Sequence, residues 1–174
     1  KTPVIFVSGH FSNFELMAME IEKSGVNLSA IYRPLNNIFL NILMERIRKK
    51  YICKNQIKKG TGGVRELLRL YKKGYSIALM IDQRVSQGIK SKFFNEEAFT
   101  TTIPAQFIKK FNCKVVPISI ERHNGVNFNI KVEKPIEFSK NSSTEKITRE
   151  LNIWLEKIIL KNPGEWIWSH DRWK

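Results

Sequence analysis

Short apolar runs alternate along this chain with longer segments of helical periodicity, and this alternation restricts the fold more than any other feature. The runs at 3–7 and 75–81 are continuous and strand-sized, as expected for strands buried on both faces. A further strand is predicted at 27–32, where an Arg-Pro pair closes it. Between these strands, apolar residues recur every three or four positions, which is typical of amphipathic helices. The alternation predicts an α/β sandwich in which helices flank a mainly parallel central sheet.

The rest of the chain fits the same arrangement. Helical periodicity begins after Ser12 and stops at Gly25, and 58–63 has the composition of a flexible basic loop. Further helices are predicted at 39–51, 64–73, 104–111 and 144–160. The Asn124-Gly125 pair is a strong hairpin signal, and it predicts one late antiparallel pair of strands at 115–121 and 128–132. A length of 174 residues suits a single domain that spans 1–174.

The chain is strongly basic, with 30 Lys and Arg residues against 16 Asp and Glu residues and a net charge of +14. This balance favours an anionic partner, such as nucleic acid, an anionic membrane surface, a phosphorylated substrate or an acidic carrier protein. Two cysteines are too few for a disulfide framework, and three scattered histidines form no zinc pattern. No apolar run is long enough to cross a bilayer.

Polar side chains follow three of the predicted strands. His10 follows the first strand, Arg33 the second and Asp82 the third. In open α/β sheets, ligands bind beyond the carboxyl ends of the strands, so these residues are expected to converge at one edge of the sheet. An arginine at this edge could bind phosphate or carboxylate through two hydrogen bonds. The alternatives are a surface arginine before a turn proline and, for Asp82, a helix cap or a turn carboxylate.

Glu15 is the predicted partner of His10. In a continuous helix, a spacing of five residues would leave the two side chains about 140° apart. Ser12 resolves this conflict as an N-cap, because Glu15 then completes a capping-box pattern in the first helical turn and can point back toward His10. A carboxylate bonded to one imidazole nitrogen leaves the other nitrogen available as a general base. Alternatively, Glu15 only caps the helix and His10 is a hydrogen-bonded turn residue.

The predicted helix at 39–51 is basic and amphipathic. Its apolar stripe consists of Leu40, Leu43, Met44 and Ile47. The charges at 45–50 could meet anionic lipid headgroups, or they could form an ordinary solvated face.

Taken together, these motifs resemble the bacterial lipid A biosynthesis acyltransferases, which are lauroyl and myristoyl transferases of the lysophospholipid acyltransferase superfamily. The matching blocks are G-H-F-S-N-F-E at 9–15, Y-R-P at 32–34 with Asn37, the arginines Arg46 and Arg48, D-Q at 82–83, F-F at 93–94 with T-T-T-I-P at 100–104, and P-G-E-W-I-W-S-H-D-R-W-K at 163–174. The blocks occur in the family's order and cover essentially the whole chain.

The resemblance implies transfer of a fatty acyl group from acyl carrier protein to a hydroxyl of a lipid A precursor, without a metal or other cofactor. It implies that His10 is the general base and that Glu15 orients it. Arg33 and Arg48 would hold anionic groups of the acceptor or stabilise the oxyanion, and Arg48 matches the family's functional arginine better than Arg46 does. Asp82 would position a polar group of the substrate or one of these arginines.

The implied partners are acyl carrier protein as acyl donor, a phosphorylated glycolipid as acceptor and an anionic membrane surface. The implied location is the cytoplasmic face of the bacterial inner membrane. Members of the family carry a longer N-terminal part with a membrane-anchoring helix. Because this chain starts abruptly with a strand, we expect that such a part precedes it.

Two other functions compete with this one. The nearer alternative is an acyltransferase of the same superfamily that acts on a lysophospholipid or a mannosylated glycolipid. The alternative of a different class is a basic nucleic-acid-binding domain, but the RNP, GXXG and zinc-finger patterns are missing, so no nucleic acid is expected as partner. The glycines at 60–63 lack the Gly-Lys-Ser/Thr ending of a nucleotide-binding loop. A third possibility is a fragment that folds but lacks its acceptor groove.

Overall fold

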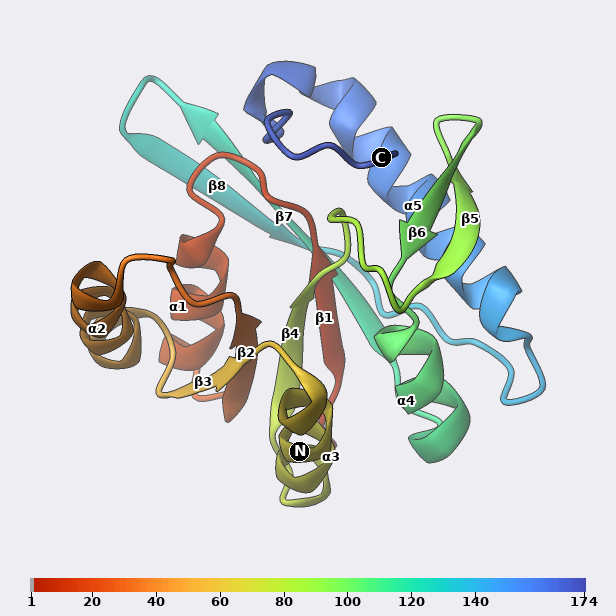
Figure 1. Cartoon of the computed structure of the whole chain (residues 1–174), viewed down its shortest axis with the longest axis horizontal. Helices are drawn as coiled ribbons and strands as arrows, with labels where there is room; N and C mark the ends of the chain where they lie inside the picture. The colour runs from red at the N-terminus through yellow and green to blue at the C-terminus, as the bar shows by residue number, and fades with distance from the viewer. Residues whose placement is uncertain (1) are drawn as a thin grey trace. The chain divides into compact units, whose positions relative to one another are not determined.

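The structure, a computed structural model, describes residues 2–174 and has the predicted α/β architecture (Figure 1). The elements in chain order are β1 Ile5–Ser8, α1 Glu15–Lys23, β2 Leu28–Tyr32, α2 Ile38–Ile47, the π-helical turn η1 Arg48–Ile52, β3 Asn55–Lys58, α3 Thr61–Lys72, β4 Ser76–Met80, β5 Ile89–Phe93, β6 Glu96–Thr100, α4 Ile103–Phe111, β7 Val115–His123, β8 Asn127–Val132, α5 Thr144–Lys161 and the 3₁₀ turn η2 Pro163–Glu165.

A six-stranded sheet has the strand order β3-β2-β4-β1-β7-β8. Strand β2 pairs in parallel with β3 and β4, and the register sets Ile31 beside Ile57 and Ala30 beside Ala78. Strands β7 and β8 form the predicted late antiparallel hairpin, whose turn residues Asn124 and Gly125 both have positive φ. Both residue types tolerate this left-handed conformation, which explains why the pair predicted a hairpin.

The chain divides into two compact units. The first unit comprises the start of the chain up to Phe6 together with Glu15–Leu79, and the second comprises Val7–Phe14 together with Met80–Lys174. In the first unit, helix α1 buries Met17, Ala18 and Ile21, the apolar face that the sequence periodicity predicted. Among the residues that the structure describes, no side chain of α2 is buried. The prediction of one domain over 1–174 stays a prediction.

The second unit is built around helix α5, which lies beside the β5–β6 hairpin (Figure 1). Asn152 of α5 is fully buried, and its Nδ2 donates a hydrogen bond to the carbonyl oxygen of Lys92 at 3.0 Å. Four apolar side chains on one side of this helix, Ile147, Leu151, Leu155 and Ile159, are buried. A buried amide that bonds the edge of the hairpin fixes its register against the helix.

Two features of the fold differ from the sequence prediction. Helix α1 begins at Glu15, so Ser12 is not its N-cap and the capping-box prediction is wrong. Ser12 instead has a φ of +44°, and its N–H donates to the carbonyl oxygen of Glu165 at 2.8 Å. Strands β3, β5 and β6 were not predicted, and Lys58, which was assigned to a loop, ends β3. Within residues 2–174, no helix is long and apolar enough to cross a membrane.

Candidate functional site

The second unit brings His10 and Asp82 together at the ends of β1 and β4. Between these strands, the N–H of Ile81 donates to the carbonyl oxygen of Ser8 at 2.9 Å, so the residues that follow emerge side by side. The backbone N–H of His10 donates to Asp82 Oδ2 at 2.7 Å, and His10 Nδ1 lies 2.8 Å from Asp82 Oδ1. This convergence at one edge of the sheet is the arrangement that the sequence predicted for the two residues.

Asp82 is only 3% exposed and is surrounded by donors. Besides the two bonds from His10, the indole Nε1 of Trp166 donates to Asp82 Oδ2 at 2.9 Å. Burial opposes ionisation of the carboxyl, but the hydrogen bonds from His10 and Trp166, together with the charge that His10 carries when protonated, outweigh it and lower the pKa of Asp82. The carboxylate is therefore ionised and directed at the histidine. Its predicted role in binding substrate stays a prediction.

The imidazole of His10 has one nitrogen engaged and remains accessible. With Nδ1–H donating to Asp82, Nε2 is the nitrogen that can accept a proton. The side chain of His10 is 16% exposed, and its ring packs edge-on against Phe14 with centroids 4.7 Å apart. A carboxylate and an aromatic ring thus hold the imidazole in one orientation, as a general base requires.

The segment around Trp166 clamps the backbone of the histidine loop. Phe11 and Trp166 form an antiparallel β-bridge, and the N–H of Ile167 donates to the carbonyl oxygen of His10 at 3.1 Å. Gly9 allows the close packing beneath this loop, because a Cβ at this position would lie 2.8 Å from Phe11 Cε2 and 3.0 Å from Leu155 Cδ1. The loop conformation therefore depends on residues that are far away in the sequence.

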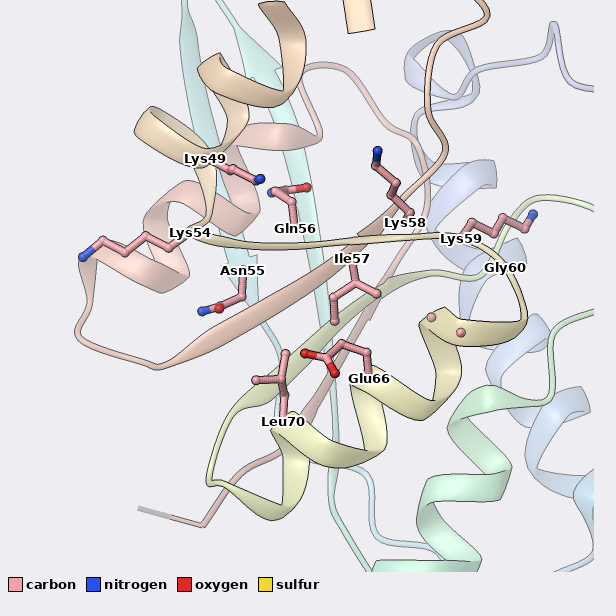
Figure 2. A pocket seen from close by; sticks show the side chains of 12 residues that line it. Lys49, Lys54, Asn55, Gln56, Ile57, Lys58, Lys59, Gly60, Glu66 and Leu70 are labelled. Carbon is pink, nitrogen blue, oxygen red and sulfur yellow. The ribbon is translucent and has the colours of Figure 1, made fainter. Parts of the chain in front are cut away.

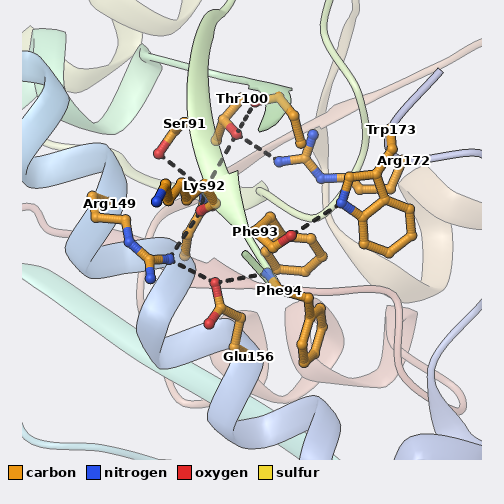
Figure 3. Close-up of polar contacts among 11 residues, drawn as sticks. Ser91, Lys92, Phe93, Phe94, Thr100, Arg149, Glu156, Arg172 and Trp173 are labelled. Carbon is orange, nitrogen blue, oxygen red and sulfur yellow. Dashed lines mark hydrogen bonds and ion pairs between the residues drawn. The ribbon is translucent and has the colours of Figure 1, made fainter. Parts of the chain in front are cut away.

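Arg172 secures the same C-terminal segment from inside the second unit (Figure 3). Its side chain has no exposed surface; Nη1 donates to the carbonyl oxygen of Phe99 at 2.7 Å and Nη2 to Thr100 Oγ1 at 2.6 Å. The guanidinium carbon lies 5.0 Å from the centroid of the Phe93 ring. Burial lowers the pKa of Arg172 to about 10, although the charge of Asp82 opposes this shift.

The sequence reasoning missed the roles of Trp166 and Arg172. Both residues lie in the C-terminal block that carried the family resemblance, but no role was predicted for either of them. Their contacts join positions more than seventy residues apart, which no local pattern records. The buried indole bonds the carboxylate that contacts His10, whereas the buried guanidinium bonds the end of β6.

The first unit places Glu15 against Arg48. Both Nε and Nη2 of Arg48 reach Glu15 Oε1, at 2.7 and 2.6 Å, and the guanidinium carbon lies 5.7 Å from the Tyr32 ring centroid. Arg46 and Arg33 are exposed. Of the two arginines of the basic helix, Arg48 is therefore the one paired with a predicted site residue. The predicted bond between Glu15 and His10 stays a prediction.

An open basic pocket of about 610 Å³ also lies in the first unit, along β3 (Figure 2). Lys49 and Gln56 point toward each other on one side of β3, whereas Asn55 and Ile57 point to the other side, toward Leu70 of α3. The lysines at its edge, Lys49, Lys54, Lys58 and Lys59, extend in different directions. The positive charge of these lysines attracts anions, but their ammonium groups do not converge on one point. Among residues 2–174, no group of three or more His, Cys, Asp or Glu side chains is arranged to hold a metal ion.

Comparison with known proteins identifies the family of the chain. The model of the family described as bacterial lipid A biosynthesis acyltransferase matches residues 1–174. The chain belongs to this family. The family resemblance inferred from the sequence motifs is thereby confirmed, and the family's name denotes acyltransferases of lipid A biosynthesis.

A curated relative supports the same assignment to the lipid A biosynthesis acyltransferases. The chain is 24% identical over 177 aligned residues to the lipid A biosynthesis acyltransferase of Haemophilus influenzae. The alignment covers 100% of this chain and 56% of that protein. The chain thus spans about half the length of the curated relative that it matches.

Proposed function

We propose that this protein transfers a fatty acyl group from acyl carrier protein to a hydroxyl of a lipid A precursor, with His10 as general base. The observation that carries the proposal is the 2.8 Å contact between His10 Nδ1 and Asp82 Oδ1 in a chain of the lipid A acyltransferase family. This contact leaves Nε2 to take a proton from the acceptor.

The chemistry needs one proton carrier. His10 Nε2 removes the proton from the acceptor hydroxyl as its oxygen attacks the thioester carbonyl. The carbon–sulfur bond then breaks, and the imidazolium returns the proton to the thiolate that leaves on the carrier protein. Asp82 holds the imidazole in the tautomer that can accept a proton and offsets the positive charge that develops on it. No acyl-enzyme intermediate is required.

Arg48, Arg33 and Glu15 have supporting roles in this proposal. Arg48 and Arg33 hold anionic groups of the acceptor or the developing oxyanion, since guanidinium groups bind phosphate and carboxylate well. Glu15 either orients His10, as the family pattern implies, or holds Arg48 through their ion pair. If the ion pair is its role, Glu15→Gln and Arg48→Lys should lower activity by amounts that do not add in the double variant. Additive losses would contradict that role.

The charge of the chain suits the proposed partners. A net charge of +14 attracts an acidic carrier protein, a phosphorylated glycolipid and an anionic membrane surface. The proposed location is the cytoplasmic face of the bacterial inner membrane. Association with each partner should weaken as the salt concentration rises, because ions screen the attraction.

The decisive experiment measures acyl transfer from labelled acyl carrier protein to a tetra-acylated lipid A precursor. His10→Ala should reduce the rate at least about 100-fold, as expected for loss of a general base. His123→Ala is the matched control, because that histidine lies at the exposed end of the β7–β8 hairpin and should leave the rate unchanged. Equal rates for wild type and His10→Ala would remove His10 as the base. Transfer only to a lysophospholipid would replace the proposed acceptor.

A further inference from the structure

Helix α2 turns its apolar side chains toward solvent. Six large apolar residues of this helix are between 38% and 85% exposed: Ile38, Phe39, Leu40, Ile42, Leu43 and Ile47. The surface helices of a water-soluble domain place such residues against the core and charged residues outside. The most exposed of the six is Phe39, the largest side chain of the group.

The polar face of α2 points inward instead. Asn41, Glu45 and Arg48 are spaced i, i+4 and i+7, so they lie along one face of the helix. Asn41 Nδ2 donates to Glu45 Oε1 at 2.7 Å, and Lys58 Nζ lies 3.2 Å from the same oxygen. At the end of the face, Arg48 bonds Glu15.

This arrangement is an inverted amphipathic helix. Glu45 and Arg48 join the helix to Lys58 and Glu15 through ion pairs, and Asn41 bonds Glu45. The apolar side chains remain exposed and can contact a partner. A contiguous apolar surface exposed by a folded domain marks a contact with an apolar partner. The inversion is therefore evidence of a partner that is less polar than water.

The charges around the apolar face indicate which partner it is. Arg46, Lys49 and Lys50 are exposed beside it, and Lys50 Nζ lies 4.9 Å from the ring centroid of the exposed Tyr51. Glu45 is the only acidic residue between positions 38 and 52, and it is engaged by Lys58. An apolar surface edged by cations and an aromatic ring is complementary to anionic lipid headgroups above acyl chains.

We infer that α2 lies in the surface plane of an anionic bilayer, with its apolar side chains at the boundary between headgroups and acyl chains. Ten helical residues extend about 15 Å, half the thickness of a hydrocarbon core, so the helix lies along the surface and does not cross it. The choice of a lipid surface rests on the proposed function, because the proposed acceptor is a membrane lipid. The test below measures binding alone, so its failure is distinguishable from a failure of acyl transfer.

The first test is co-sedimentation of the purified 174-residue chain with vesicles of phosphatidylethanolamine and phosphatidylglycerol. The variant Phe39→Ser/Leu40→Ser/Leu43→Ser should bind at least about 100-fold more weakly, since each inserted side chain of this size contributes about tenfold. The matched control is Val126→Ser/Val132→Ser/Leu160→Ser, whose residues are 58% to 80% exposed in the second unit, and its binding should equal that of wild type. Equal binding by both triple variants would overturn the inference.

The second test locates the helix in the bilayer. Phe39→Cys and Val126→Cys provide single exposed thiols for an environment-sensitive fluorophore, because the native Cys53 and Cys113 are buried. The label at position 39 should shift to the blue on vesicle binding and be quenched by brominated acyl chains, whereas the label at 126 should not. No change at position 39 while the chain binds vesicles would overturn the inference.

A second copy of the chain is the competing occupant of this face. If it covers α2, sedimentation without lipid will show a dimer that Phe39→Ser/Leu40→Ser/Leu43→Ser converts to a monomer, and the inference is wrong. A monomeric wild type agrees with the inference.

The double variant Lys49→Glu/Lys50→Glu should weaken binding to anionic vesicles about 30-fold or more. Each lysine near such a surface contributes about fivefold to binding, and reversing its charge removes more than that.

Discussion

The variant Asp82→Asn tests most directly whether Asp82 sets the tautomer of His10. In Asp82→Asn, the shape of the side chain is kept, but one oxygen becomes an NH₂ group. The oxygen that remains can still accept the bonds from the His10 N–H and from Trp166 Nε1, which both reach Oδ2. The NH₂ group then faces His10 Nδ1, 2.8 Å away in the wild type. Nδ1 must therefore act as an acceptor, and the proton moves to Nε2.

The cost of restoring the productive tautomer sets the size of the effect. With Nδ1–H opposite NH₂, two buried donors lose their acceptor, and each unsatisfied donor costs about 1–3 kcal/mol. A total of about 2–6 kcal/mol corresponds to a loss of about 30-fold to 10⁴-fold in rate, because each 1.36 kcal/mol changes a rate tenfold. We expect the loss in kcat, with KM little changed, because Asp82 is buried behind the histidine.

The assay is acyl transfer at saturating acceptor, with circular dichroism to confirm that the Asp82→Asn protein is folded. Asp171→Asn is the matched control, because that carboxylate lies on the surface of the same unit. A rate for Asp82→Asn within about threefold of wild type would refute the reasoning. If Glu15→Gln then caused the large loss, the carboxylate that orients His10 would be Glu15, as the family pattern implies.

Three further outcomes follow from the packing and charges of the second unit. Gly9→Ala should lower stability by about 1–3 kcal/mol, measured by thermal unfolding, because its Cβ would lie 2.8 Å from Phe11 Cε2; an unchanged melting temperature would contradict this packing. Arg172→Lys should also destabilise the fold, by about 2 kcal/mol in urea unfolding. The bonds to the Phe99 carbonyl and to Thr100 come from two separate nitrogens of the guanidinium group, and the single nitrogen of lysine cannot occupy both positions. The pKa of Asp82 is lower in the folded chain than its usual value of 3.8, so its ionised form stabilises the fold above about pH 4 and this contribution disappears as the pH falls through the folded-state pKa. The difference in free energy of unfolding between wild type and Asp82→Asn should accordingly shrink below pH 4. A difference that grows on acidification would contradict the lowered pKa of Asp82.

The sequence predicts where polar groups emerge from the sheet better than it predicts what they contact. His10 and Asp82 could be placed at one edge because each follows a buried parallel strand. The bond between them depends on the pairing of β1 with β4, in which Ile81 bonds Ser8, and no local pattern shows this pairing. The capping-box pattern failed because the bond from Ser12 to the Glu165 carbonyl holds Ser12 in a left-handed conformation outside the helix.

Helix α2 shows a second limit of sequence reasoning. The periodicity correctly marked Leu40, Leu43, Met44 and Ile47 as one side of a helix, because spacing alone determines which residues share a face. It could not tell whether that side faces a protein core or the outside, because both environments select the same apolar residues. Strands β5 and β6 were missed for a related reason: lysines and glutamates alternate with the buried Phe93 and Ala98 in segments too short to stand out.

The clamp on the histidine loop has a consequence for how the protein is made. Residues 165–167 hold the backbone of His10 to Ser12, and a ribosome that adds 5–20 residues per second reaches them about 8–30 s after it has made the loop. During synthesis, the predicted general base therefore lacks the backbone bonds that fix its loop. If translation stops before residues 165–167, the nascent chain contains His10 but lacks the backbone bonds that hold its loop. The arrangement that we propose for acyl transfer can thus assemble only after residues 165–167 have been translated.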